Sequence, residues 1–283
     1  MINPVDGHIF LVDKPLGWSS FHVVKKLRGA LLARLRPAGV RKLKVGHAGT
    51  LDPLASGVML ICCGRATRRI DELQAGRKTY TAEIALGATT PSFDLETPVD
   101  ATYPTDHITP EAAEKAIAGF IGRIEQVPPA YSACKVDGKR AYAIARKGDD
   151  PGLKPKILVI DSIELLHFSR QSITIRVVCS KGTYIRALAR DIGFALGTGA
   201  HLTALRRDSV GDARLSDCLS VDEAEHHIRT APMAITLEDG TCIEVPPLPP
   251  RIETGSTLSR ADILPWNLRQ QPATAATAGT PTE

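Results

Sequence analysis

The stretch GHAGTLDPLASGVMLICC, residues 46–63, joins a glycine-rich loop to a run of six apolar residues. The apolar run, residues 58–63, is continuous, which is typical of a strand buried on both faces of a sheet. The three glycines of the loop allow tight turns and a close approach of the backbone to a ligand. Asp52 lies among them, next to a proline, so a carboxylate is placed where the chain enters a buried strand.

Two interpretations of Asp52 are open from the residues alone. An aspartate before proline is a good N-cap for one helical turn. Catalysis is the other interpretation, because His47 shares the loop and a basic stretch leads into it. No acidic residue lies between Asp13 and Asp52, whereas nine basic residues do: Lys14, Lys25, Lys26, Arg28, Arg34, Arg36, Arg41, Lys42 and Lys44. Such a stretch favours a nucleic acid as partner, although a solvated helix face has the same composition.

Composition excludes several classes of protein. The 283 residues are 43% hydrophobic and 23% charged, with a net charge of +4, as expected of a globular chain. No apolar run reaches the roughly 18 residues of a membrane span, and we expect no secretory signal. The six cysteines have no zinc spacing, so we expect no metal and a reducing, cytoplasmic setting. Neither glycine-rich nucleotide motif is present, so we expect no nucleotide cofactor.

Hydrophobic periodicity predicts an α+β fold with a mixed, largely antiparallel sheet flanked by helices. We expect strands at residues 8–12, 58–63, 78–86, 157–168, 173–180 and 201–210. We expect helices from Ser19 or Ser20 to residue 35 and at residues 109–122, 183–196 and 220–229. A short basic helix, residues 138–147, is expected within an excursion over residues 128–155. The chain becomes proline-rich from residue 246 and is expected to be disordered from about residue 270.

A second cluster, SKGTYIR, spans residues 180–186 and places Arg186 in the first turn of a predicted helix. The positive end of the helix dipole disfavours a cation there, unless an anion lies nearby. We hypothesise that Arg186 forms an ion pair with Asp52 and keeps it ionised. An exposed arginine that contacts solvent or an RNA phosphate is the alternative.

Tyr80 lies on the alternating strand predicted at residues 78–86. It is either a core side chain or, in an RNA enzyme, the ring on which a flipped base stacks. The excursion carries seven basic residues against three acidic ones between residues 133 and 156. Lys135, Lys139 and Arg140 are among them. This segment is either a mobile arm that closes over RNA or an ordinary solvated loop.

These segments together resemble the TruB family of tRNA pseudouridine synthases. The resemblance covers residues 9–211, in five motifs that occur in the family's order: residues 13–20, 46–57, 78–80, 128–142 and 179–207. It implies the pseudouridine synthase fold, no cofactor and no metal. It also implies an enzyme that isomerises the uridine at position 55, in the T-loop of tRNA. We expect a monomer.

The resemblance also implies residue roles. Asp52 is the catalytic carboxylate and Arg186 its partner, Tyr80 stacks on the flipped base, and Tyr184 and Leu205 line the pocket. The residues expected to bind RNA are His47, Lys14, Lys135, Lys139, Arg140 and Arg206. Lys14, together with Pro15, is also expected to support the site.

We expect a catalytic domain over residues 1–230, including an RNA-clamping insertion at about 128–155, and a short extension over residues 231–283. Many members of the family end in an RNA-binding PUA domain, but the acidic and then proline-rich sequence after Gly211 does not suggest a complete one.

Three alternatives remain open. The first is a tRNA-folding chaperone that uses the same surface without catalysis. The second is a pseudouridine synthase that modifies another hairpin of T-loop-like shape. The third is a nucleoside hydrolase, which normally needs a second carboxylate. We see no second acid placed like Asp52 in the sequence.

Overall fold

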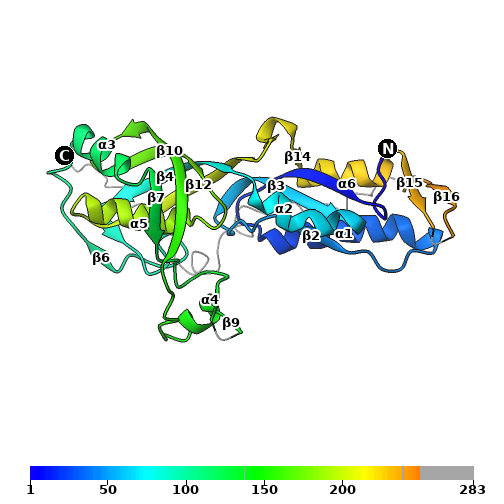
Figure 1. The fold of residues 1–283 in the computed structure, drawn as a ribbon, viewed down its shortest axis with the longest axis horizontal. Helices are drawn as coiled ribbons and strands as arrows, with labels where there is room; N and C mark the ends of the chain where they lie inside the picture. The colour runs from blue at the N-terminus through cyan, green and yellow to red at the C-terminus, as the bar shows by residue number, and fades with distance from the viewer. Residues whose placement is uncertain (137, 238, 249–283) are drawn as a thin grey trace, which may run out of the picture.

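The computed structural model describes residues 1–136, 138–237 and 239–248, and a single mixed sheet runs through them (Figure 1). Its strands lie in the order β14-β1-β3-β12-β4-β11-β10-β7, with β13 beside β12 and β2 beside β3. The β1–β14 and β3–β12 pairs are parallel and the other pairs are antiparallel, which confirms the predicted sheet.

The strands of this sheet are β1 (His8–Lys14), β2 (Val45–His47), β3 (Ala55–Cys63), β4 (Lys78–Leu86), β7 (Gly122–Gln126), β10 (Lys156–Phe168), β11 (Ser172–Cys179), β12 (Ala200–Val210), β13 (Ala213–Arg214) and β14 (Leu219–Ser220). Short hairpins add β5 (Ala88–Thr89) with β6 (Ala101–Thr102), β8 (Lys135–Val136) with β9 (Lys139–Arg140), and β15 (Met233–Thr236) with β16 (Cys242–Val245).

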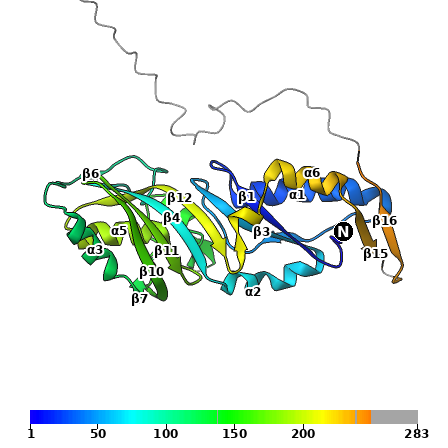
Figure 2. The same cartoon turned by 90° about the horizontal axis from the view of Figure 1, so that it is seen from above.

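The α-helices are α1 (Ser20–Leu35), α2 (Ile70–Ala75), α3 (Pro110–Ala118), α4 (Ala141–Ala145), α5 (Ile185–Ala195) and α6 (Val221–Thr230), with short 3-10 turns at Arg36–Ala38, Gly64–Arg69 and Leu215–Asp217. Ser19 caps α1 and Thr109 caps α3 through their side chains, and Ser220 with Glu223 forms a capping box on α6. In Figure 2, α1 and α6 lie side by side on one face of the sheet and α2 lies on the other.

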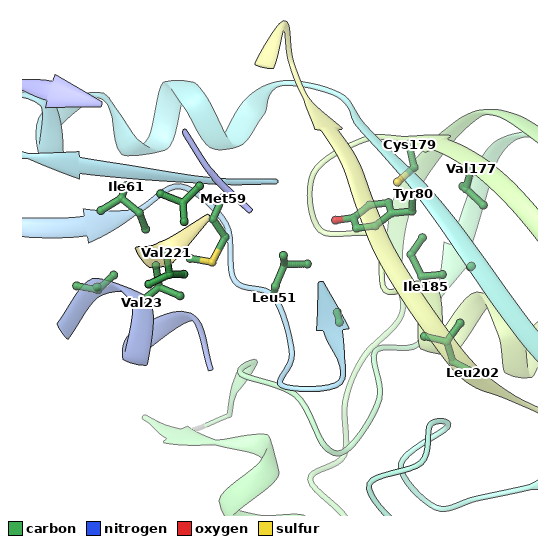
Figure 3. Packing of buried hydrophobic residues seen from close by; sticks show 14 of the residues in the cluster. Val23, Leu51, Met59, Ile61, Tyr80, Val177, Cys179, Ile185, Leu202 and Val221 are labelled. Atoms are coloured by element: carbon green, nitrogen blue, oxygen red, sulfur yellow. The ribbon is translucent and has the colours of Figure 1, made fainter. Parts of the chain in front are cut away.

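Strand β4 has the predicted alternation. Tyr80 and every second residue up to Leu86 are buried, and the residues between them are more exposed. The inward side chains join a hydrophobic core that also takes in α1, α5 and α6 (Figure 3). The core therefore holds the two halves of the sheet together where β12 separates β3 from β4.

Strand pairing at this centre fixes which distant residues meet. On one side of β12, Leu205 pairs with Ala55 and Arg207 with Gly57. On the other side, Leu205 pairs with Ala82 and Arg207 with Tyr80. Gly57 has a φ of +108°, and a Cβ there would lie 2.2 Å from the Arg207 carbonyl oxygen, so only glycine permits this approach.

Some boundaries differ from the predictions. The helix expected at 109–122 ends at Ala118, because the chain turns into β7 at Gly122, where φ is +103°. The helix expected from residue 183 begins at Ile185, after the turn at Gly182. The basic helix expected at 138–147 is the shorter α4, because Lys139 and Arg140 form the second strand of a hairpin.

The end of the described chain packs against its beginning. Ile2 bridges Met233, and both side chains are buried in the main core, as are Ile235 and Val245. Residues 231–246 therefore belong to the packed unit, whereas the predicted extension starts at residue 231. The tail predicted to be disordered from about residue 270 lies outside the described residues.

Within the described part of the chain, no helix has the length and apolar character needed to cross a bilayer.

Candidate active site

A cavity of about 310 Å³ opens at the centre of the sheet, where β3, β4 and β12 meet. It is lined by six segments of the chain: the loop before β3, the end of α2, strand β4, the start of the insertion, the turn that leads into α5, and strand β12. The lining residues include Thr50, Leu51, Asp52, Lys78, Tyr80, Ser132, Tyr184, Arg186, Leu205 and Arg207. The five residues predicted for catalysis and for its support are all among them.

Asp52 and Arg186 form the ion pair that the sequence predicted. The Nη2 atom of Arg186 lies 2.9 Å from Oδ2 of Asp52. Both residues line the cavity, but the side chain of Arg186 is only 4% exposed, whereas that of Asp52 is 41% exposed, so the carboxylate is the accessible member of the pair. Asp52 does not cap a helix. Its carbonyl accepts a bond from the Ala55 N–H in a tight turn that leads directly into β3.

Asp94 is a second carboxylate at the same guanidinium, but it is not placed like Asp52. Its Oδ2 lies 3.5 Å from Nε of Arg186, and its side chain is 4% exposed. Burial raises the pKa of Asp94, and the charge of Arg186 opposes that rise. Asp94 does not line the cavity. The two acids therefore differ in role: Asp94 holds the arginine, and Asp52 faces the space where a substrate would lie.

Two backbone carbonyls are the remaining hydrogen-bond partners of Arg186. Its Nη1 donates to the carbonyl of Ser92 at 3.0 Å, and its Nη2 donates to that of Tyr131 at 2.9 Å. Since the first turn of α5 contains no acidic residue, the anions that offset the helix dipole come from other segments. Four partners around one planar group fix both its position and its orientation.

The loop that carries Asp52 is held from two sides. The buried hydroxyl of Ser20, the first residue of α1, accepts from the N–H of Leu51 at 2.8 Å and donates to its carbonyl at 2.9 Å. Arg207, which is 1% exposed, donates to the carbonyls of Val58 and Gly49 at 2.7 and 3.2 Å. The backbone beside Asp52 therefore has little freedom.

Lys14 is completely buried, which contradicts the prediction that it contacts RNA. Its ammonium donates to the carbonyls of Pro15 at 3.0 Å and Trp18 at 2.6 Å, so it shapes the turn between β1 and α1. Burial lowers the pKa of Lys14 to about 8, although the nearby charge of Asp52 opposes the shift. Lys78, at the start of β4, has its pKa lowered to about 8 by burial as well.

Two tyrosines lie at the cavity. Tyr80 is 8% exposed, and burial raises its pKa. In Figure 3 its ring points from β4 toward the part of the molecule that carries Leu51. Tyr184 donates its N–H to the side-chain oxygen of the buried Gln126 at 2.9 Å, and its hydroxyl lies 3.2 Å from the Cys134 thiol. Burial raises the pKa of Tyr184 too, so both hydroxyls stay protonated at neutral pH.

The other residues predicted to contact RNA do not line this cavity, and their environments differ. Lys135, Lys139 and Arg140 are exposed on the β8–β9 hairpin, which with α4 projects from the sheet (Figure 1). His47 is half-buried and has a pKa lowered by burial, so it is neutral at pH 7. Arg206 is not free, because its Nη2 lies 2.9 Å from Oδ2 of Asp13.

Asp94, Lys78 and Arg207 also belong to the site, and the sequence alone assigned no role to them. Arg207 had a signal in the sequence, because adjacent residues on a strand point to opposite faces and either Arg206 or Arg207 had to point inward. For Asp94 the local sequence gives no comparable signal.

The arrangement suits chemistry on a nucleobase or a sugar. One ionised carboxylate faces a cavity with aromatic and aliphatic walls, and cations lie behind it and beside it. Among the described residues, no three His, Cys, Asp or Glu side chains are grouped so that they could hold a metal ion.

Comparison with known families and proteins gives one consistent result. Residues 36–185 match the family described as TruB family pseudouridylate synthase (N terminal domain). Residues 186–234 match the tRNA pseudouridylate synthase B C-terminal domain. The tRNA pseudouridine synthase B of Phocaeicola vulgatus is 64% identical over 221 residues, which cover 78% of this chain and 93% of the relative. That of Flavobacterium johnsoniae is 44% identical over 225 residues, or 80% and 97% of the two chains.

Solved structures give the same fold. The chain is similar to the archaeal box H/ACA sRNP Nop10-Cbf5 complex with a TM-score of 0.55 and 25% identity, over 80% of this chain and 55% of that one. A Cbf5-Nop10-Gar1 complex matches with a TM-score of 0.56 and 26% identity, over 77% of this chain and 54% of that one. The chain therefore spans about half the length of these structures.

Proposed function

The chain belongs to the TruB family of pseudouridine synthases and is an isomerase that makes pseudouridine in tRNA; we propose that its target is uridine 55 in the T-loop and that Asp52 is the catalytic carboxylate. The observation that carries the proposal is the asymmetry of the ion pair. Both residues line the cavity, but the side chain of Arg186 is 4% exposed and that of Asp52 is 41% exposed, so it is the carboxylate that is presented to a ligand. An ionised carboxylate presented in this way can act on the glycosidic bond of a bound nucleoside.

The reaction needs no external reactant. The N1–C1′ bond of uridine breaks, the uracil rotates, and a C5–C1′ bond forms in its place. The proton lost from C5 is balanced by the proton gained at N1, so the product is an isomer and no electrons are exchanged. Asp52 serves either as the nucleophile or as the base in this sequence.

The cavity is suited to a single base removed from its stack. Uridine in a folded loop must be flipped out, at a cost of a few kcal/mol. Tyr80 offers a ring on which the base can stack, and Leu205 and Tyr184 form the walls. The exposed cations of the β8–β9 hairpin favour the RNA backbone beside the cavity, and recognition of the loop by shape is expected to dominate. A cytoplasmic monomer is part of the proposal.

The test is tritium release from C5-labelled uridine in a T-arm stem-loop. We expect release by the wild type, none by Asp52→Asn, and equal RNA binding by both. Asp106→Asn is the matched control, because Asp106 is an exposed aspartate in the loop before α3 and does not line the cavity. Equal release by wild type and Asp52→Asn would refute the role of Asp52. Tight binding without release by either protein would leave the chaperone function as the better explanation.

A further inference from the structure

The exposed face of α1 carries a straight row of side chains that the proposed reaction does not use. Phe21, Lys25, Arg28 and Arg36 are spaced by four, three and eight residues, which places them on one side of the helix. All four are exposed, and the Phe21 ring is 68% exposed. The chain continues from this row through Arg41, Lys42 and Lys44, which are exposed as well. We call the six cations of this set the basic ridge.

None of the six cations of the basic ridge forms an ion pair or a side-chain hydrogen bond with another described residue, and the other cations of α1 have partners. Lys26 pairs with Asp222 and with Glu225, the latter at 3.3 Å, on the neighbouring α6. The guanidinium of Arg34 is buried against backbone carbonyls. The acids of α6 therefore neutralise one flank of α1 and leave the opposite flank positive.

The basic ridge begins at the catalytic loop. Ser20, the first residue of α1, makes the two hydrogen bonds to Leu51, next to Asp52. From there α1 extends for about 24 Å, at 1.5 Å per residue over its 16 residues. In Figure 1, α1 runs along the lower edge of the right-hand part, and the β8–β9 arm projects downward from the left-hand part. An RNA held at the cavity thus has positive charge on both sides.

We propose that the basic ridge is a second RNA-binding surface, which grips the phosphate backbone of tRNA outside the T-arm stem-loop. The proposal rests on the proposed tRNA substrate. It explains why the unpaired cations lie in a line that leads away from the site, because a polyanion rod needs contacts along its length. Phe21, at the end next to the cavity, offers an aromatic face for an unpaired base or a ribose.

The basic ridge can strengthen RNA binding only by direct contact with the RNA. At physiological salt the screening length is about 8 Å, and Arg28 and Arg36 lie roughly 12 and 24 Å along the helix from Ser20. Removing these charges therefore leaves the electrostatics of the cavity almost unchanged. It weakens only those substrates that are long enough to reach the ridge.

The experiment compares full-length tRNA with the isolated T-arm stem-loop. The variant Arg28→Ala/Arg36→Ala/Arg41→Ala removes three cations of the ridge. The control variant Lys115→Ala/Arg123→Ala/Arg170→Ala removes three exposed cations from α3, β7 and the β10–β11 turn, with the same change in net charge. Within the described chain, none of the three side chains forms an ion pair or a hydrogen bond. For each protein, Kd is measured at several salt concentrations, and tritium release is measured under single-turnover conditions on both RNAs.

We expect the ridge variant to bind full-length tRNA about tenfold more weakly, with a salt slope reduced by about 3, and to process the bound stem-loop at the wild-type rate. The control variant should match the wild type on both RNAs. Equal losses for the two variants, or equal losses on the two RNAs, would overturn the proposal. Binding to vesicles of anionic lipid is measured in parallel. A ridge variant that loses affinity for these vesicles, and keeps wild-type affinity for tRNA, would also overturn the proposal. Failure of the proposed function is seen separately, as no tritium release by the wild type on either RNA.

Discussion

Replacing Arg186 by methionine tests the central arrangement of the site most directly. The substitution keeps an unbranched side chain of similar length and removes the guanidinium. Asp52, which is 41% exposed, can then be solvated, but Asp94, which is 4% exposed, is left buried without a cation. The variant should therefore lose both stability and activity, for different reasons.

The size of the stability loss follows from the geometry. At the observed 3.5 Å between Nε of Arg186 and Oδ2 of Asp94, Coulomb's law with an effective dielectric constant of about 20 gives about 5 kcal/mol of attraction. Removing one partner of a buried pair costs about 3 to 5 kcal/mol. Activity should fall about a hundredfold or more, because Asp52 loses the group that orients it.

A double-mutant cycle makes the reasoning refutable. Asp94→Asn should destabilise the wild type but stabilise Arg186→Met, because in the variant it removes the unpaired buried charge. Urea unfolding gives the four free energies, and single-turnover tritium release shows whether activity stays low in the double variant. If Asp94→Asn destabilises both backgrounds equally, Asp94 does not serve as a partner of Arg186.

Three further outcomes are expected. Ser20→Ala leaves the N–H and carbonyl of Leu51 unpaired, so urea unfolding should show a loss of about 1 to 3 kcal/mol and single-turnover rates should fall. Arg34→Leu removes a buried clamp on the carbonyls that end α6 and β16, so the melting temperature should fall by several degrees while the rate per folded molecule stays constant. The wild-type rate should decline as pH rises through about 8, where Lys14 and Lys78 lose their protons. Replacing each lysine in turn by methionine shows which of the two causes the decline. Unfolding is not its cause. A lysine pKa lowered from 10.5 to about 8 leaves more protons on the unfolded chain between these two pH values, so the lysines make the folded state more stable as the pH rises. A rate that stays flat from pH 7 to 9 would contradict the assignment.

The sequence by itself determined the parts of the molecule that depend on neighbouring residues. The strict alternation from Tyr80 to Leu86 predicts β4, and the serine and threonine caps predict where α1, α3 and α6 begin. The need of Arg186 for a nearby anion was also predictable, because the first turn of a helix disfavours a cation; that Asp52 supplies this anion was a hypothesis, which the fold confirmed. Each of these signals acts within a few residues of the position concerned.

Only the tertiary structure decided which distant groups converge. Arg186 donates to the carbonyl of Ser92, which lies 94 residues earlier in the sequence, and it pairs with Asp94 of the same segment. No periodicity connects the two segments. The burial of Lys14 and the inward direction of Arg207 depend on how β1, β3 and β12 are aligned. Strand register sets these neighbours, and it is fixed by the packing of the whole core rather than by any single segment. For this reason the sequence singles out Asp52 as the candidate carboxylate, and the fold determines which charged groups surround it.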